Sequence, residues 1–139
     1  MSRVYRPEQK VHEKVWGKEL WICNTPLYCG KILYLKKGFR CSIHHHFYKD
    51  EHFYLLSGRI YLEIGGEKYT MEVGDAIHVP PGLKHRFTGI LNSEILEIST
   101  QHFEDDSYRT TQSERCSWFK KNIVDKWRKA RGQTDEQCE

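Results

Sequence analysis

Hydrophobic and polar residues alternate in short stretches through the middle of the chain. Residues 60–64 read Ile-Tyr-Leu-Glu-Ile, which is the period of a β-strand with one buried face. Gly65 and Gly66 follow directly, and glycine permits the positive φ angles that a two-residue hairpin turn needs. The pattern therefore predicts a hairpin whose second strand is residues 67–73.

Further short strands are predicted on both sides of this hairpin. Residues 14–23 indicate two short strand pieces with Gly17 as the turn between them. Short strands separated by turn residues are typical of an antiparallel sandwich or barrel. The pattern therefore predicts one all-β domain over residues 15–110. Its other strands are expected at 27–35, 40–47, 51–56, 76–79, 84–88 and 94–100.

The two ends of the chain have a different pattern. Residues 1–14 are mostly polar and are predicted to be an N-terminal arm. Within residues 111–139 we expect an amphipathic α-helix, about 114–131, and a tail, because apolar residues recur every three or four positions. We expect the apolar stripe to pack on the barrel or on a second copy of the chain; the basic opposite face alternatively suits a membrane surface or a partner. The stripe is formed by Cys116, Phe119, Ile123, Trp127 and Ala130.

Composition narrows the class of protein. With 139 residues, 38% hydrophobic and 29% charged, the chain has the size and make-up of one globular domain. No run approaches the roughly 20 apolar residues of a membrane span, and residues 1–14 do not resemble a secretory signal. Five cysteines without a Cys-x-x-Cys pair favour a reducing compartment, so we expect a cytoplasmic location. The net charge of +3 is too small to indicate nucleic-acid binding.

Histidines and one carboxylate are arranged so that they could bind a metal ion. His44 and His46 lie two residues apart, so on a strand they share a face. Glu51 follows after a short polar gap that suits a turn into a neighbouring strand. His85 comes after the turn residues Pro80-Pro81-Gly82 and supplies a third imidazole. Imidazole and carboxylate ligands together suit one divalent ion, such as Zn, Mn, Fe, Ni or Co.

These residues lie within two motifs that resemble those of the cupin superfamily. The match covers roughly residues 28 to 100, and the only departure is Gly89, where the second motif usually has Asn. The resemblance implies a double-stranded β-helix, also called a jelly-roll barrel, that holds one metal ion. The first motif matches at Gly38, His44, His46, Glu51 and Gly58, and the second at Gly74, Pro80, Gly82 and His85.

A finer pattern is similar to the cupin domain of type II mannose-6-phosphate isomerases. The similarity includes Ser42, the Glu-His-Phe run at 51–53 and the Glu-Asp-Asp-x-x-Arg run at 104–109. Three residues differ from that family's pattern. His44 replaces a glutamine, which makes the site a stronger metal site, while Lys49 replaces an arginine and Phe53 a tryptophan.

This resemblance implies a metal-dependent sugar or sugar-phosphate isomerase or epimerase that works through an enediol. A divalent ion would polarise the carbonyl and hydroxyl pair, and a side chain with a near-neutral pKa would move the proton. Glu51, His52 and Lys49 are the candidate catalytic residues, although strand alternation points His52 away from the ion. The substrate would be bound by Lys49, Arg86, Arg109 and His102.

Other functions remain compatible with the same residues. A site of three histidines and one glutamate also suits an Fe(II)-dependent dioxygenase, and a cupin of this kind could bind a sugar or another small molecule without catalysis. In each case we expect a small-molecule ligand, no nucleic acid and no membrane. Because cupin barrels often pair, we also expect a homodimer.

Overall fold

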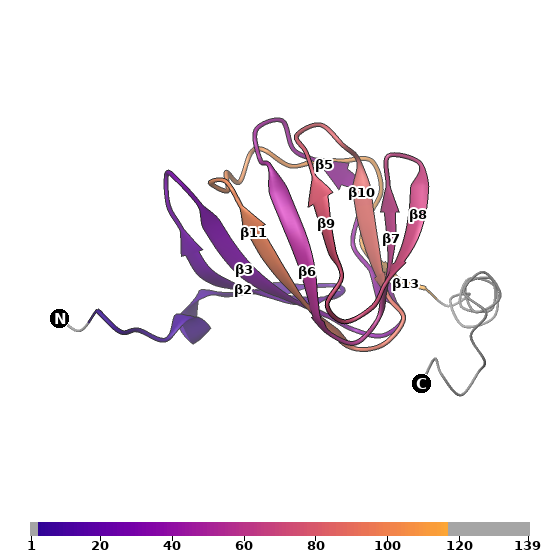
Figure 1. The fold of residues 1–139 in the computed structure, drawn as a ribbon, viewed down its shortest axis with the longest axis horizontal. Coiled ribbons are helices and arrows are strands. Elements are labelled where there is room, and N and C mark those ends of the chain that lie inside the picture. The colour runs from indigo at the N-terminus through magenta and orange to yellow at the C-terminus, as the bar shows by residue number, and fades with distance from the viewer. Residues whose placement is uncertain (1–2, 117–139) are drawn as a thin grey trace.

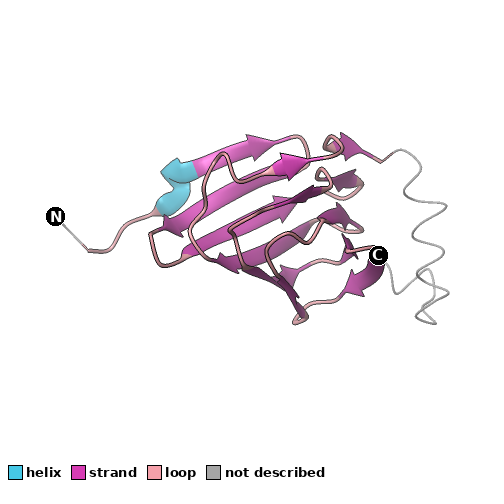
Figure 2. Ribbon diagram, turned by 90° about the horizontal axis from the view of Figure 1, so that it is seen from above, coloured by secondary structure: helices cyan, strands magenta, loops and turns pink. Residues whose placement is uncertain are grey.

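The computed structural model describes residues 3–116, and they form two antiparallel β-sheets. The first sheet has six strands, which lie side by side in Figure 1. Their order is β1 (Val11–Lys14), β2 (Gly17–Asn24), β3 (Cys29–Leu35), β11 (Ser93–Ser99), β6 (Glu51–Ser57) and β9 (Ala76–Val79). A short 3-10 helix, η1 (Pro7–Lys10), precedes β1 and is the cyan element in Figure 2.

The second sheet is built around β10 (His85–Gly89). This strand pairs with β7 (Ile60–Ile64), which in turn pairs with β8 (Glu67–Met71) in the predicted hairpin. The remaining strands of this sheet contain only two residues each. They are β12 (Tyr108–Arg109), β5 (His44–His45), β4 (Phe39–Arg40) and β13 (Glu114–Arg115).

The core lies between the sheets, and strand alternation determines which side chains reach it. In β6, Phe53 and Leu55 are buried while Tyr54 is exposed. From the second sheet, Leu62 and Phe87 join the same apolar cluster. Burying large apolar side chains of this kind contributes about 1.5–3 kcal/mol each to stability. The predicted all-β jelly-roll fold is therefore confirmed.

Two glycines of the predicted motifs have a clear structural role. Gly58, in the turn between β6 and β7, has φ +86°, and a Cβ there would collide with the backbone of Asn92 and Ser93. A Cβ at Gly89 would lie only 2.5 Å from the carbonyl oxygen of Lys36. The close approach of these two backbones explains why a larger residue such as Asn does not fit at position 89.

Some predicted elements differ from the observed ones. The strand expected at 40–47 is interrupted, because pairing ends at Arg40 and resumes at His44. Residues 11–14, predicted to belong to the arm, form β1 and pair with β2. Glu114–Arg115 form β13, so the predicted helix does not begin at Glu114. The rest of that helix, at 117–131, lies outside the described residues.

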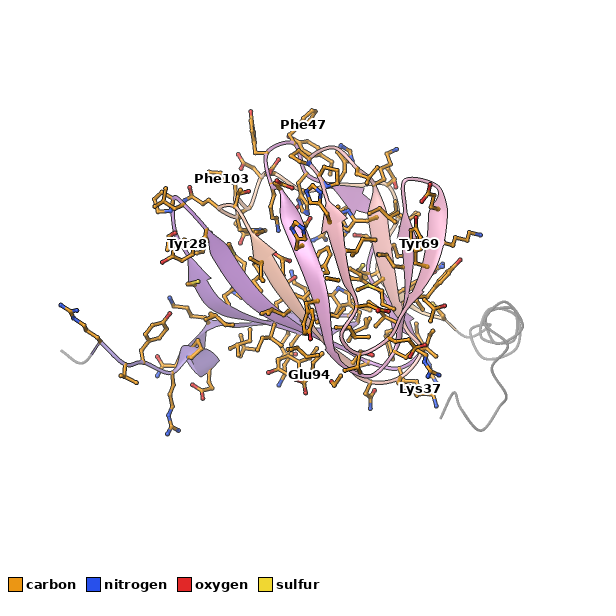
Figure 3. All side chains as sticks on the ribbon, viewed as in Figure 1. Tyr28, Lys37, Phe47, Tyr69, Glu94 and Phe103 are labelled. Carbon is orange, nitrogen blue, oxygen red and sulfur yellow. The ribbon has the colours of Figure 1, made fainter. Side chains whose placement is uncertain are left out.

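The loops at one end of the sheets carry exposed aromatic side chains. Figure 3 shows Tyr28, Phe47 and Phe103 toward this end, with Lys37 and Glu94 at the opposite end. β5, which carries His44, lies at the same end as Phe47. In the part of the chain that the structure describes, no helix is long and apolar enough to cross a bilayer.

Candidate metal centre

Three histidines from two separate segments meet between the sheets. His44 on β5 lies opposite His85, the first residue of β10. His46 follows β5 after one residue, so it returns to the face of His44. One ring nitrogen from each of His44, His46 and His85 lies within 4.8 Å of the other two. These residues could therefore hold one metal ion together.

Each of the three imidazoles is oriented by a hydrogen bond from its Nδ1 to a backbone carbonyl. The acceptors are Ser42 for His44 at 2.8 Å, Asp106 for His46 at 2.7 Å and Leu83 for His85 at 3.0 Å. Because a carbonyl oxygen only accepts, each Nδ1 carries the hydrogen and each Nε2 has a free lone pair. Metal-binding histidines are held in this way by their other ring nitrogen.

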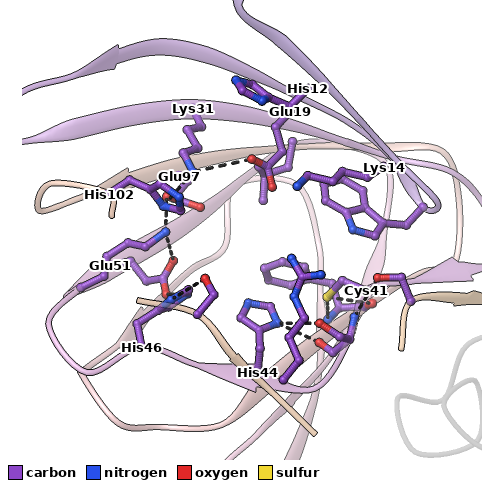
Figure 4. A pocket seen from close by; sticks show the side chains of 18 of the residues that line it. His12, Lys14, Glu19, Lys31, Cys41, His44, His46, Glu51, Glu97 and His102 are labelled. Atoms are coloured by element: carbon purple, nitrogen blue, oxygen red, sulfur yellow. Dashed lines mark hydrogen bonds and ion pairs between the residues drawn. The ribbon is translucent and has the colours of Figure 1, made fainter. Parts of the chain in front are cut away.

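Glu51, the first residue of β6, directs a carboxylate oxygen at two of these imidazoles. Its Oε2 lies 3.4 Å from Nε2 of His46 (Figure 4) and 3.6 Å from Nε2 of His85. Two of these atoms, Oε2 of Glu51 and Nε2 of His85, are buried and have no hydrogen-bond partner. Ligands about 2.0–2.2 Å from a metal ion stand roughly 3–3.5 Å apart. The spacing and the unpartnered atoms therefore fit a divalent ion.

Burial sets the charge of these groups. It lowers the pKa of His44 and of His46 to about 4 and that of His85 to about 3. The imidazoles are therefore neutral at pH 7, which is the form that binds metals. Burial, together with the nearby charge of Glu97, raises the pKa of Glu51 to about 8. A bound cation would reverse this shift, because it favours the carboxylate.

A buried ion pair lies next to Glu51. The Lys49 ammonium is 3.2 Å from Oε2 of Glu97 and 4.0 Å from Oε1 of Glu51. Burial opposes ionisation of Glu97, but the ammonium groups of Lys49 and Lys31 hold its pKa at about 2. Lys49 therefore stands between a permanently charged carboxylate and the candidate metal ligand Glu51.

A second polar cluster surrounds Lys31, whose exposed fraction is only 1%. Its ammonium lies 3.2 Å from Nδ1 of His102, 3.6 Å from Oε1 of Glu19 and 4.2 Å from the ring centre of Trp21. Burial and the charge of Lys31 lower the pKa of His102 to about 3. His102 is therefore neutral, and it accepts a hydrogen bond from Lys31 at Nδ1.

The metal-site residues and the Lys31 cluster share one cavity of about 340 Å³ (Figure 4). Among the predicted site residues, the cavity lining contains His44, His46, Lys49, Glu51, His102 and Arg109. His85 is not part of the cavity lining. Its ring is buried and packs against the rings of His44 and His46.

Two predicted site residues are not brought to the cavity. His52 is exposed on the outer face of β6 and stacks on His78, with ring centres 4.6 Å apart. Arg86 points away from the site toward Thr111 and Glu63. Each of these two residues follows a site residue directly on its strand, and alternation turns it to the other face.

The sequence analysis missed Lys31, Glu97, Glu19 and Trp21, which all line the cavity. A signal for two of them was present. Lys31 shares a strand face with Leu33, and Glu97 shares one with Ile95, so each charged residue occupies an inward position in an apolar row. Buried charges at such positions are rare unless they are paired or functional.

Comparisons with known proteins agree with this architecture. The nucleoside dehydratase Pac13 from Streptomyces superposes with a TM-score of 0.70 at 15% identity, over 81% of this chain and 93% of that one. KdgF from Halomonas sp. superposes with a TM-score of 0.60 at 21% identity, over 63% and 81%. At these identities the two structures show a shared fold.

A curated relative and a family match give the closer relationship. A mannose-1-phosphate guanylyltransferase from Escherichia coli is 27% identical over 119 residues, which is 80% of this chain but 25% of that enzyme. Among the first curated relatives, this chain spans between 20% and 54% of their length. Residues 31–98 match the family described as "Cupin domain". Together with the two antiparallel sheets, this match shows that the chain belongs to the cupin superfamily.

Proposed function

We propose that this chain is a metal-dependent isomerase or epimerase that acts on a sugar or sugar phosphate. The observation that carries the proposal is the arrangement around Glu51. One of its oxygens faces the free Nε2 atoms of His46 and His85, and the other faces the Lys49 ammonium. A substrate that reaches the candidate metal site would therefore also meet a carboxylate and an ammonium group.

His44, His46 and His85 would hold the ion, with Glu51 as a fourth ligand. When bound, the ion would supply a Lewis acid that polarises a carbonyl and a neighbouring hydroxyl. Burial raises the pKa of Glu51 to about 8 when no cation is bound to it, so its carboxylate is a stronger base once it has left the ion. Since the three imidazoles suffice to hold an ion, Glu51 can accept the proton from the carbon next to the carbonyl.

Lys49 has the complementary role. Glu97 and Glu51 favour its charged form, so that its pKa is raised although burial opposes this. The ammonium can donate a hydrogen bond to the oxygen on which negative charge develops as the enediol forms. Lys31 and His102 form a polar wall of the same cavity and would bind hydroxyl groups of the substrate.

The similarity to mannose-1-phosphate guanylyltransferases supports a sugar phosphate as the substrate class. Those enzymes are named for a sugar phosphate, and this chain matches about a quarter or less of their length. The similarity thus concerns only one part of a larger enzyme. It supports a class of ligand, a sugar phosphate, and not a particular reaction.

Proton exchange tests the proposed reaction. Metal-loaded protein is incubated in deuterated water with a panel of aldose and ketose sugars and their phosphates, and NMR follows exchange at the carbon next to the carbonyl. We expect exchange with at least one substrate and none with His46→Ala. Binding without exchange across the panel would contradict the isomerase and favour a non-catalytic cupin. Bound iron together with substrate-dependent oxygen uptake would favour the dioxygenase.

A further inference from the structure

The cavity opens between the free edges of the two sheets. Its exposed lining residues lie on two segments only: residues 12–15, which include most of β1, and residues 104–109, which include β12. β1 is the end strand of the first sheet, and β12 is an end strand of the second. A ligand that enters the cavity therefore passes between these two strands.

Four cationic side chains line the cavity, and they differ in whether a carboxylate faces them. Lys31 lies 3.6 Å from Glu19, and Lys49 lies 3.2 Å from Glu97. Lys14 and Arg109 line the cavity as well. Within residues 3–116, neither of these two side chains makes a hydrogen bond or an ion pair. The two inner cations are thus each paired with a carboxylate. Among the described residues, the two cations at the mouth are not, although Glu13 and Glu104 also line it.

Lys14 and Arg109 stand on opposite sides of the opening. Lys14 lies on β1, and Figure 4 shows its side chain extending into the cavity. Arg109 lies on β12, in register with the candidate metal ligand His44 on β5. Glu104 is the carboxylate that lines the cavity on that side, and its Oε1 lies 3.9 Å from Nε2 of His102.

We infer that Lys14 and Arg109 form an anion site that binds the phosphate group of the substrate at the mouth of the cavity. This inference rests on the proposed function, which places the reacting carbonyl deeper, at the candidate metal centre. The planar guanidinium of Arg109 suits two-point contact with phosphate oxygens, and the ammonium of Lys14 supplies a point charge from the other side. Of the cations predicted to bind the substrate, Arg109 keeps that role, whereas carboxylates face Lys49 and Arg86 points away from the cavity.

Inorganic phosphate is the probe that tests the site. Its binding to the purified chain is measured by calorimetry for the wild type, Arg109→Gln, Lys14→Gln and the double variant. Each single change should weaken binding about tenfold, and the double variant should lose it, because a charged hydrogen bond is removed each time. Lys84→Gln, an exposed lysine outside the cavity, should bind like the wild type. Equal binding in all variants would overturn the inference.

Two further experiments distinguish phosphate binding at this site from phosphate binding to the metal ion, and test whether the site prefers phosphate to another anion. Protein treated with a chelator should still bind phosphate within about threefold of the untreated protein; complete loss would show that phosphate binds the metal instead. Acetate should bind at least tenfold more weakly than phosphate, because it carries less charge and fewer oxygens. Equal affinity for the two anions would contradict the assignment to phosphate.

The anion site and the proposed reaction can fail separately. If phosphate does not bind but an unphosphorylated sugar shows proton exchange, the anion site is wrong and the isomerase stands. If phosphate binds as described but no sugar phosphate exchanges protons, the anion site stands and the reaction is wrong.

Discussion

Nδ1 of His46 donates a hydrogen bond to the backbone carbonyl of Asp106, 60 residues further along the chain, over 2.7 Å. The carboxylate of the same aspartate accepts hydrogen bonds from the amides of Phe47 at 2.7 Å and Lys49 at 3.1 Å. Asp106 is therefore the residue that fixes both a candidate metal ligand and the loop that leads to Lys49 and Glu51.

Removing this carboxylate should disturb the site without touching a ligand. Asp106→Ala leaves the loop amides without acceptors, so we expect a loss of about 1–3 kcal/mol in the free energy of unfolding. Metal affinity should fall about 10- to 100-fold, because the loop that joins His46 to Glu51 loses the carboxylate that holds it in place. Chemical denaturation and metal titration measure the two effects. Asp105→Ala, at an exposed neighbour, is the control, and equal behaviour of the two variants would contradict this role.

Glu51→Gln should separate stability from metal binding. Without an ion, burial keeps the Glu51 carboxyl protonated up to a pH of about 8, so a neutral amide should change the melting temperature of chelator-treated protein little. Metal affinity should fall at least tenfold, because the amide is a weaker ligand than a carboxylate. Full metal affinity in this variant, measured by titration with Zn²⁺, would remove Glu51 from the ligand set.

The buried ion pair should be costly to break. Glu97→Gln leaves the Lys49 ammonium without its nearest carboxylate, and we expect a loss of roughly 3–5 kcal/mol in the free energy of unfolding. Glu94→Gln, on the exposed face of the same strand, should change stability by less than about 0.5 kcal/mol. A Glu97 variant as stable as the Glu94 variant would show that the pair contributes nothing.

Acid should destabilise the metal-free fold. The folded-state pKa is about 4 for His44 and His46 and about 3 for His85 and His102, against an ordinary value of 6.5. Below pH 6.5 the unfolded chain therefore binds more protons than the folded chain, so stability falls as pH falls. Glu51 opposes this, because its raised pKa lets the folded state hold one extra proton between pH 4.5 and about 8.

Four histidines minus Glu51 leave the unfolded chain with about three more protons than the folded chain. The free energy of unfolding therefore changes by at most about 4 kcal/mol per pH unit. Thermal unfolding of chelator-treated protein at pH 7 and pH 5.5 should show a melting temperature lower by roughly 10 °C at the lower pH. A melting temperature that is unchanged or higher at pH 5.5 would contradict the burial of these imidazoles.

Local patterns in the sequence predicted most of the barrel. The alternation at residues 60–64, the Gly65–Gly66 turn and the returning strand are all observed. The strand predicted at 76–79 has the observed bounds. These elements depend on strand period and turn chemistry, which are local properties. The interruption between Arg40 and His44 was not predictable in this way, because it depends on which strands lie alongside.

Motif spacing predicted which candidate metal ligands lie close together. His44, His46, Glu51 and His85 are brought together, whereas the proposed role of Arg86 relied on its place in a motif and ignored the face of its strand. The inner wall around Lys31 and Glu97 was missed because each residue lies alone in its own strand. Only the pairing of β3 and β11 with each other brings them into one cavity.

Metal content is the most direct test of the central claim, which is that the free Nε2 atoms of His44, His46 and His85 hold a divalent ion between the sheets. Elemental analysis of the purified chain, before and after dialysis against Zn²⁺ or Mn²⁺, measures the occupancy. The account predicts about one ion per chain in the wild type and a loss of it in His46→Ala and His85→Ala, while His78→Ala on the outer face keeps it. Full occupancy in His46→Ala, or none in the reconstituted wild type, would contradict the account.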